Sequence, residues 1–180
     1  PNHQQWETDG KVDKRMFRAA GEQGLLGMAV PERFGGAGVT DFRFNAVISE
    51  ETMAADVFGS GMCITLHNDI CLPYFLAYAD DDQKARWLPG MASGEIMTAI
   101  AMTEPGTGSD LAGITTSAIR EGDDYVINGS KTFITNGPVA DVFVVYAKLA
   151  RGDEDKEIEN FIVLREDPGL STGTAFQKMG

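Results

Sequence analysis

The second half of the sequence contains Tyr125-Val126-Ile127-Asn128-Gly129-Ser130-Lys131-Thr132-Phe133-Ile134, the stretch that decides the class of fold. Two short runs of β-branched and aromatic residues, 125–127 and 132–134, flank an Asn-Gly pair. Asn-Gly between such runs is the strongest short-range signal for a β-hairpin, because both residues accept the backbone angles of a tight turn. We therefore predict two antiparallel strands joined at Asn128-Gly129.

Further strand-like segments lie on either side of this stretch. From Ile96 onward apolar and polar residues alternate with a period of two, which is typical of strands. The predicted strands are residues 114–119, 141–149 and 161–165, with a weaker one at 170–176. The charge-rich residues 151–159 are predicted to form a solvated loop.

The first half of the sequence has a helical period instead. Apolar residues recur at helical spacing in residues 11–28, and Asp41 is suited to cap a second helix. The apolar residues 64–79 predict a buried helix that Pro73 starts or kinks. A fourth helix opens with the capping box of Asp80 and Gln83 and bends near Pro89-Gly90.

A run of helices followed by a run of strands predicts an α+β protein. The same order of elements also fits two separate domains, and in either case the border is expected near Gly94. The predicted sheet stops without a closing strand. Because a half-finished sheet leaves unpaired edges, we expect the working protein to continue past Gly180.

Composition excludes several classes of protein. The chain of 180 residues has a net charge of −12 and a pI of about 4.5, which disfavours a nucleic-acid binder. The two cysteines, Cys63 and Cys71, lack metal-ligand spacing and are predicted to be reduced, buried thiols. No run approaches the roughly 20 apolar residues of a membrane span, and no metal site is predicted. The expected location is the bacterial cytoplasm, or the mitochondrial matrix in a eukaryote.

Residues 101–113 carry the candidate chemistry, with the sequence Ala101-Met102-Thr103-Glu104-Pro105-Gly106-Thr107-Gly108-Ser109-Asp110-Leu111-Ala112-Gly113. Backbone N–H groups freed by the glycines could form a nest for a phosphate, with hydroxyls as further donors. The third glycine of a dinucleotide fingerprint would fall at Leu111, and no Gly-Lys-Ser/Thr of a Walker loop is present. On composition alone, a polar turn between strands is the favoured interpretation of the stretch.

The same residues resemble the first sequence signature of the acyl-CoA dehydrogenase family, including its Thr-Glu-Pro-Gly core and the Gly-Ser-Asp that follows. A second family hallmark is similar to residues 126–137, and the resemblance runs from residues 24–27 to the terminal residues 178–180. The wording of both motifs is most similar to the long-chain branch. The resemblance implies an N-terminal all-α domain at residues 1–96 and a truncated, antiparallel middle β-barrel domain at residues 97–180. It also implies a C-terminal four-helix domain, which residues 1–180 do not include.

The family resemblance also implies roles for individual residues around FAD. The loop from Ile100 to Ser109 would pass the isoalloxazine ring and the phosphates, with Thr103 beside the ring. Ser109 would meet both the cofactor and the CoA part of the substrate. The segment Phe133 to Thr135 would line the other face of the flavin, with Thr135 near N5. The implied cofactor contacts are Ile100, Ala101, Met102, Thr103, Gly108, Ser109, Phe133, Ile134 and Thr135.

Plainer interpretations of these residues stay open. Phe133 and Ile134 also fit an ordinary barrel core, and Thr135 fits a strand residue before a turn. His67, in an apolar stretch, is more typical of a hydrogen-bonded packing residue than of a catalyst. Glu104 and Asp110 are predicted to organise the loop and not to act as bases.

Through the resemblance, the full-length protein is expected to oxidise a fatty acyl-CoA to the trans-2-enoyl-CoA and to pass electrons to an electron-transferring flavoprotein, as a homotetramer. The family's catalytic glutamate would lie beyond Gly180, so residues 1–180 alone would hold no catalytic base and be inactive. An acyl-CoA oxidase, a flavin monooxygenase of the same fold and a non-catalytic acyl-CoA-binding protein are the alternatives.

Overall fold

The computed structural model describes residues 2–150 and 156–176, and contacts within the chain divide it into two units. The helical unit comprises the described residues of Pro1–Ala99, Thr135–Asp141 and Ser171–Gly180. The sheet unit comprises the described residues of Ile100–Ile134 and Val142–Leu170. Helices precede strands along the chain, so the α+β prediction is confirmed.

The helical unit contains the predicted helices with shifted boundaries. In chain order its helical elements are α1 (His3–Asp9), α2 (Lys14–Glu22), η1 (Glu32–Phe34), α3 (Arg43–Ala54), α4 (Phe58–Thr65), η2 (Leu66–Cys71), α5 (Leu72–Tyr78) and α6 (Asp81–Ser93). Asp41 accepts a hydrogen bond from the Arg43 N–H at the start of α3. Asp80 and Gln83 form the expected capping box, and α6 continues through Pro89 to Ser93.

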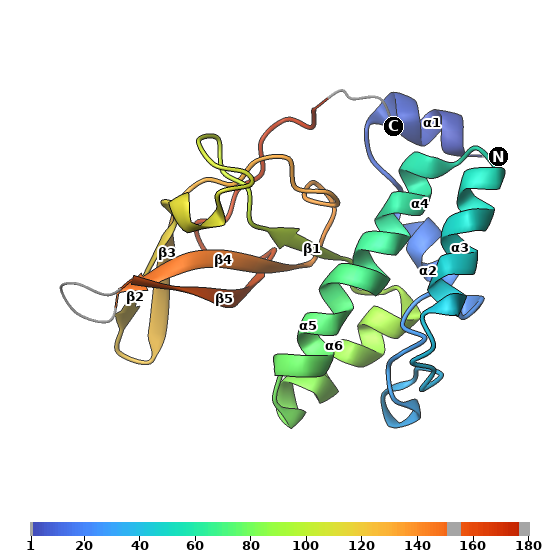
Figure 1. The fold of residues 1–180 in the computed structure, drawn as a ribbon, viewed down its shortest axis with the longest axis horizontal. Helices are drawn as coiled ribbons and strands as arrows, with labels where there is room; N and C mark the ends of the chain where they lie inside the picture. Colours follow the sequence, from blue (N-terminus) through green and yellow to red (C-terminus); the bar gives the residue numbers. More distant parts are fainter. Residues whose placement is uncertain (1, 151–155, 177–180) are drawn as a thin grey trace. The chain divides into compact units, whose positions relative to one another are not determined.

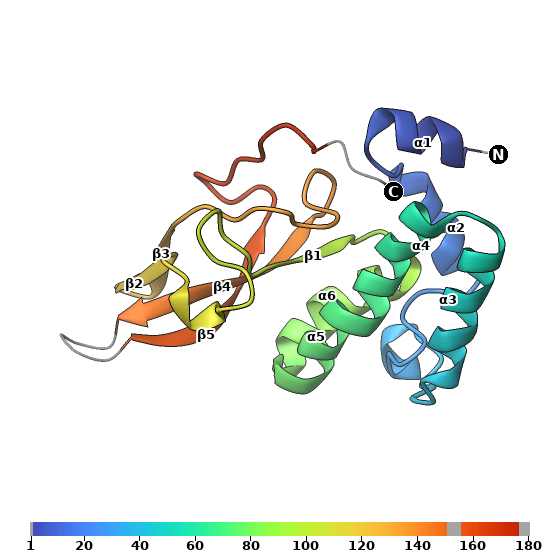
Figure 2. The same ribbon diagram turned by 45° about the horizontal axis from the view of Figure 1, so that its top comes forward.

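Helices α4 and α5 follow one another as one rod, joined by the π-helical turns of η2 (Figures 1 and 2). Pro73 lies in the first turn of α5, as the sequence indicated. A proline inside a regular helix removes one hydrogen bond and clashes with the carbonyl four residues earlier. The wider π-helical turns of η2, which the sequence did not indicate, come just before this proline. Turns of this kind commonly accommodate an interruption of the regular helical hydrogen bonds.

The core of the helical unit forms around Phe17, whose side chain is completely buried. It packs with Ala20, Leu26, Ile64 and Met97. Gly94 ends α6 with a φ of 77°, and a Cβ at this position would lie 2.1 Å from the Phe17 carbonyl oxygen. Glycine is therefore required there both for the left-handed turn and for close packing against α2.

Residues 135–141 complete the helical unit although they follow much of the sheet unit in the chain. The Asp141 carboxylate pairs with Lys14 and accepts a hydrogen bond of 2.9 Å from the Met97 N–H. The Asn136 amide donates to the Thr98 carbonyl at 3.1 Å. These contacts tie the segment to both ends of the helical sequence.

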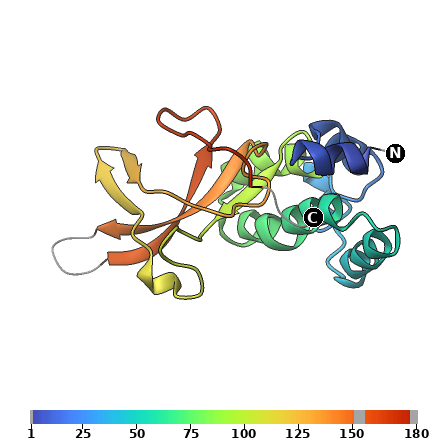
Figure 3. The same ribbon diagram turned by 90° about the horizontal axis from the view of Figure 1, so that it is seen from above.

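Within the described residues the sheet has five strands, β1 (Thr98–Ala101), β2 (Ser117–Glu121), β3 (Asp124–Asn128), β4 (Val142–Ala150) and β5 (Lys156–Leu164). The order is β1-β4-β2-β3, and β5 also pairs with β4 (Figure 3). The sheet is open, and β2 pairs with β4 in parallel, so one pairing departs from the expected antiparallel barrel. Ala118, Ala147 and Leu149 form its buried cluster.

The predicted hairpin at Asn128-Gly129 is wrong. The tight turn instead lies at Gly122-Asp123, between β2 and β3, where Gly122 supplies a φ of 67°. Asn128 ends β3, and residues 129–134 are not a strand. Gly129 serves close packing, because a Cβ there would lie 2.2 Å from Thr116 Oγ1. The same Asn-Gly signal thus marks a position without room for a side chain.

Two other strand boundaries also differ from the predictions. Strand β5 begins at Lys156, so residues 156–159 belong to a strand and not to the predicted solvated loop. The rest of that loop, residues 151–155, lies outside the described residues. Residues 170–176 form no strand in the described chain, which removes the weakest prediction.

Candidate functional site

A tight loop follows β1 and contains four of the predicted site residues, Met102, Thr103, Gly108 and Ser109. The Glu104 N–H donates to the Thr107 carbonyl at 2.9 Å, and the Thr107 N–H donates back to the Glu104 carbonyl at 3.1 Å. This reciprocal pair closes a two-residue turn at Pro105-Gly106, where proline fixes one φ angle and glycine relaxes the next. The backbone of the loop is therefore held at its base and exposed at its tip.

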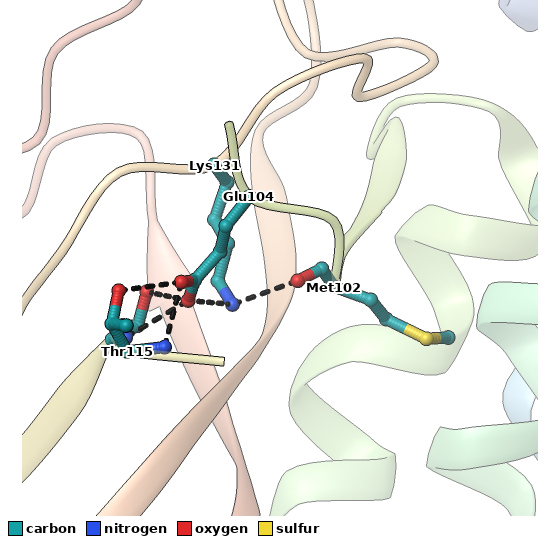
Figure 4. Close-up of polar contacts among 5 residues, drawn as sticks. Met102, Glu104, Thr115 and Lys131 are labelled. Atoms are coloured by element: carbon teal, nitrogen blue, oxygen red, sulfur yellow. Dashed lines mark hydrogen bonds and ion pairs between the residues drawn. The ribbon is translucent and has the colours of Figure 1, made fainter. Parts of the chain in front are cut away.

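Glu104 points inward from the loop and is 5% exposed. Its Oε2 accepts hydrogen bonds of 2.7 Å from both the N–H and the hydroxyl of Thr115. Its Oε1 accepts from the Thr116 N–H at 2.8 Å and from the Thr116 hydroxyl. The carboxylate thus fixes the loop to the segment that leads into β2, as Figure 4 shows. The prediction that Glu104 organises the loop is confirmed.

The ammonium group of Lys131 completes this cluster. Its Nζ lies 2.9 Å from Glu104 Oε1 and donates to the Met102 carbonyl at 2.9 Å, and both charged side chains are almost fully buried. Burial raises the pKa of Glu104, but the hydrogen bonds from Thr116 and Thr115 outweigh it and hold that pKa well below its usual range. Glu104 is therefore an anion at neutral pH and has no proton to exchange.

The predicted flavin-facing loop is hydrogen-bonded at this cluster to Lys131 and Thr132, the two residues just before the predicted Phe133–Thr135 segment. The Thr132 N–H donates to the Thr103 carbonyl at 2.9 Å, next to the Lys131 bond to the Met102 carbonyl. Two consecutive residues, Lys131 and Thr132, thus bind the carbonyls of Met102 and Thr103. Widely separated segments would have excluded a common site for the two motifs.

Phe133 has the most unusual backbone among the predicted site residues. Its φ is +58°, a left-handed conformation that is uncommon for a bulky residue, and its side chain is 56% exposed. A strained residue that presents an aromatic ring to the outside is typical of a binding site, since strain persists only where the surroundings impose it. This argues against the alternative that Phe133 belongs to an ordinary barrel core.

The remaining predicted residues differ in their burial and in the unit to which they belong. Ile100 and Ala101 end β1, Met102 and Thr103 are half-buried, and Gly108 and Ser109 lie on the exposed part of the loop. Ile134 is half-buried, whereas Thr135 is exposed and groups with the helical unit. A Cβ at Gly106 or Gly108 would meet nothing within 4 Å, so the loop tip is open to a ligand.

His67 is a packing residue, as its apolar surroundings indicated. It is fully buried, its Nε2 lies 2.9 Å from the Met91 carbonyl, and its Nδ1 lies 2.8 Å from the Thr98 hydroxyl. Burial lowers the pKa of His67 to about 4, so the ring is neutral and donates from Nε2. Cys63 and Cys71 are both free, but only Cys71 is fully buried; Cys63 is half-buried.

Sequence reasoning missed Lys131, Thr115 and Thr116 as parts of the site. Lys131 lay inside the expected hairpin, where a lysine has no assigned partner. The consecutive threonines follow the loop at no periodic spacing. The usable signal was Glu104 itself, because a carboxylate that organises a loop from the inside requires several hydrogen-bond donors.

Other features carry less information about function. In the part of the chain that the structure describes, no helix has the length and apolar character needed to cross a membrane. Among the same residues, no group of three or more histidine, cysteine or acidic side chains is placed to hold a metal. A shallow hollow of about 490 Å³ is lined by residues of η1, α2 and α6, including Arg33 and Phe34, and by none of the predicted site residues.

Comparisons with known proteins show which family the chain resembles over its whole length. Residues 1–95 match the family described as acyl-CoA dehydrogenase, N-terminal domain, and residues 99–180 match acyl-CoA dehydrogenase, middle domain. The chain is 40% identical over 182 residues to the mitochondrial long-chain specific acyl-CoA dehydrogenase of Sus scrofa, covering 100% of this chain and 42% of that protein.

Two solved structures have the same fold. An acyl-CoA dehydrogenase from Geobacillus kaustophilus is 44% identical with a TM-score of 0.86, covering 94% of this chain and 44% of that one. An acyl-CoA dehydrogenase from Bacillus anthracis, complexed with FAD, is 36% identical with a TM-score of 0.86, covering 97% of this chain and 29% of that one. The chain therefore spans less than half the length of these relatives.

Proposed function

The chain belongs to the acyl-CoA dehydrogenase family, and from this premise we propose that its protein oxidises a fatty acyl-CoA to the trans-2-enoyl-CoA with FAD. The observation that carries the proposal is the hydrogen bond between the Thr132 N–H and the Thr103 carbonyl, which joins the loop after β1 to residues 131–133. Next to this bond lies Phe133, an exposed aromatic residue whose backbone is in the left-handed conformation. Both elements belong to the sheet unit.

The residues present fit a flavin. The loop from Thr103 to Ser109 offers hydroxyls, open glycine positions and no buried anion at its tip, which suits an anionic, hydroxyl-rich ligand. An exposed phenylalanine ring offers a flat apolar face to an aromatic ring system. When bound, FAD supplies a hydride acceptor for the β-carbon of the substrate.

The roles of the protein residues follow from their chemistry. Thr103 and Thr135 would donate hydrogen bonds toward the flavin ring, and Phe133 would cover the ring and exclude water. Ser109 would bind both the cofactor and the CoA part of the substrate. The α-proton would go to a glutamate outside residues 1–180, so the residues described here bind and orient but do not take the proton.

Electrons would leave to an electron-transferring flavoprotein, and a homotetramer would be the working assembly. These proposals, and the long-chain preference, rest on family membership and on the long-chain enzyme named above. Substrates of increasing acyl length offered to the full-length protein would test the preference.

The test of the proposed function uses the full-length protein. We expect a flavin absorbance band in the purified protein and its bleaching by a fatty acyl-CoA under anaerobic conditions, with enoyl-CoA formed in equal amount. Slow reoxidation in air supports a dehydrogenase, whereas rapid release of hydrogen peroxide would identify an oxidase. A colourless protein that takes up no added FAD would contradict the proposal.

A further inference from the structure

We propose that Lys131 and Glu104 are positioning residues for the flavin, because together they fix the direction of the Met102–Thr103 peptide. This inference rests on the proposed function and adds to it a cause for the shape of the loop. Neither side chain is among the residues predicted to touch the cofactor. Both act through the main chain of residues that are.

The first step is the geometry of the peptide. Lys131 Nζ holds the Met102 carbonyl at 2.9 Å. In a planar trans peptide the N–H points away from the carbonyl, so the Thr103 N–H is turned to the side opposite Lys131. The next carbonyl, that of Thr103, is held by the Thr132 N–H. Two consecutive peptides are thus held by two consecutive residues, Lys131 and Thr132, and the Thr103 N–H is directed away from Lys131.

The second step is the rigidity of the lysine itself. A lysine side chain has several freely rotating bonds, and a single bond to a carbonyl would hold it weakly. Here Glu104 fixes the ammonium group at 2.9 Å, and four donors from Thr115 and Thr116 fix the carboxylate in turn. The cluster is a rigid support of the kind that holds a binding residue within a fraction of an ångström.

The third step concerns charge. Lys131 and Glu104 neutralise each other, so the intact pair adds no net charge next to the loop. Removing one member leaves the opposite charge buried. A buried anion near a flavin disfavours the reduced, more negative cofactor, and a buried cation favours it. The two single substitutions should therefore shift the flavin midpoint potential in opposite directions.

The experiment compares Lys131→Met and Glu104→Gln in the full-length protein, with Lys148→Met of β4 as the matched control. We expect both site variants to bind FAD about tenfold more weakly, the loss that corresponds to one hydrogen bond to a charged group. We expect Lys131→Met to lower the midpoint potential, Glu104→Gln to raise it, and Lys148→Met to change neither. Circular dichroism of the apoproteins confirms that the variants are folded.

Each other outcome has one meaning. Unchanged FAD affinity and potential in both site variants would overturn the proposal, as would a shift of the potential in the same direction in both. An equal loss in Lys148→Met would also overturn it, because the effect would not be specific to the cluster. If Lys131→Met does not fold, the midpoint potential of Glu104→Gln alone tests the proposal: a higher potential supports it, and an unchanged or lower potential overturns it. A wild-type protein that binds no FAD would refute the proposed function instead.

Discussion

The two units of the molecule bury polar groups in opposite ways. In the helical unit His67 has one carbonyl and one hydroxyl as partners, and burial keeps it neutral. In the sheet unit Glu104 has four donors and an ammonium group, which keep it charged despite burial. The comparison teaches that burial alone does not decide the charge of a side chain. The number of complementary donors does.

The largest expected effect comes from breaking the charged cluster. Glu104→Leu leaves the Lys131 ammonium group and the Thr116 hydroxyl buried without the Glu104 carboxylate, so the apparent free energy of unfolding should fall by about 3–5 kcal/mol. Urea unfolding of the full-length apoprotein measures the change, and the exposed Glu121→Leu is the control, expected within about 0.5 kcal/mol of wild type. A loss as small as that of the control would show that the donors find other partners.

Acid should affect the neutral network through His67. Its pKa is lowered from 6.5 to about 4 in the folded protein, so the unfolded chain binds the proton more tightly. Stability is then full above pH 6.5 and falls as the pH drops toward 4, by up to about 3 kcal/mol. His67→Gln should remove this part of the acid sensitivity, as seen in melting temperatures between pH 7 and 4. The control His3→Gln should leave it in place; equal pH slopes in wild type and His67→Gln would contradict the prediction.

A smaller effect is expected from crowding the charged cluster without removing it. A Cβ added in Gly129→Ala would lie 2.2 Å from Thr116 Oγ1, a donor to Glu104. Thr116 must move to relieve that overlap, which should lower the free energy of unfolding by about 1–3 kcal/mol. Thermal unfolding compares this variant with Gly173→Ala, whose Cβ would meet nothing within 4 Å. Equal melting temperatures for the two would mean that Thr116 moves freely.

The smallest effect is expected from the neutral network. Thr98→Val keeps the shape of the buried side chain but removes the hydroxyl that contacts His67 Nδ1. One neutral hydrogen bond is worth about 1 kcal/mol, so the loss should be well below that of Glu104→Leu. The same urea measurement ranks the two, and an equal or larger loss in Thr98→Val would reverse the comparison between the units.

Local signals predicted the helices well and the sheet less well. The capping box at Asp80 and the position of Pro73 follow from chemistry within one or two turns of helix, so the sequence contains the cause. The prediction of a hairpin at Asn128-Gly129 was wrong because glycine is needed at position 129 for close packing against Thr116 and not for a turn. Thr116 is distant in the sequence, so local signals do not reveal this contact. The candidate site shows the same difference. Its motif residues were predicted from local sequence, whereas the role of Lys131 was recognised only from its ion pair with Glu104 in the structure.

The return of residues 135–141 to the helical unit has a consequence for how the chain is made. On the ribosome the helices emerge first, but Lys14 must wait for Asp141, which is 127 positions later. The nascent helical region therefore lacks its last ion pair, and the Asn136 bond to Thr98, while most of the sheet sequence is being translated. The helical unit can therefore finish folding only after residues 135–141 have left the exit tunnel.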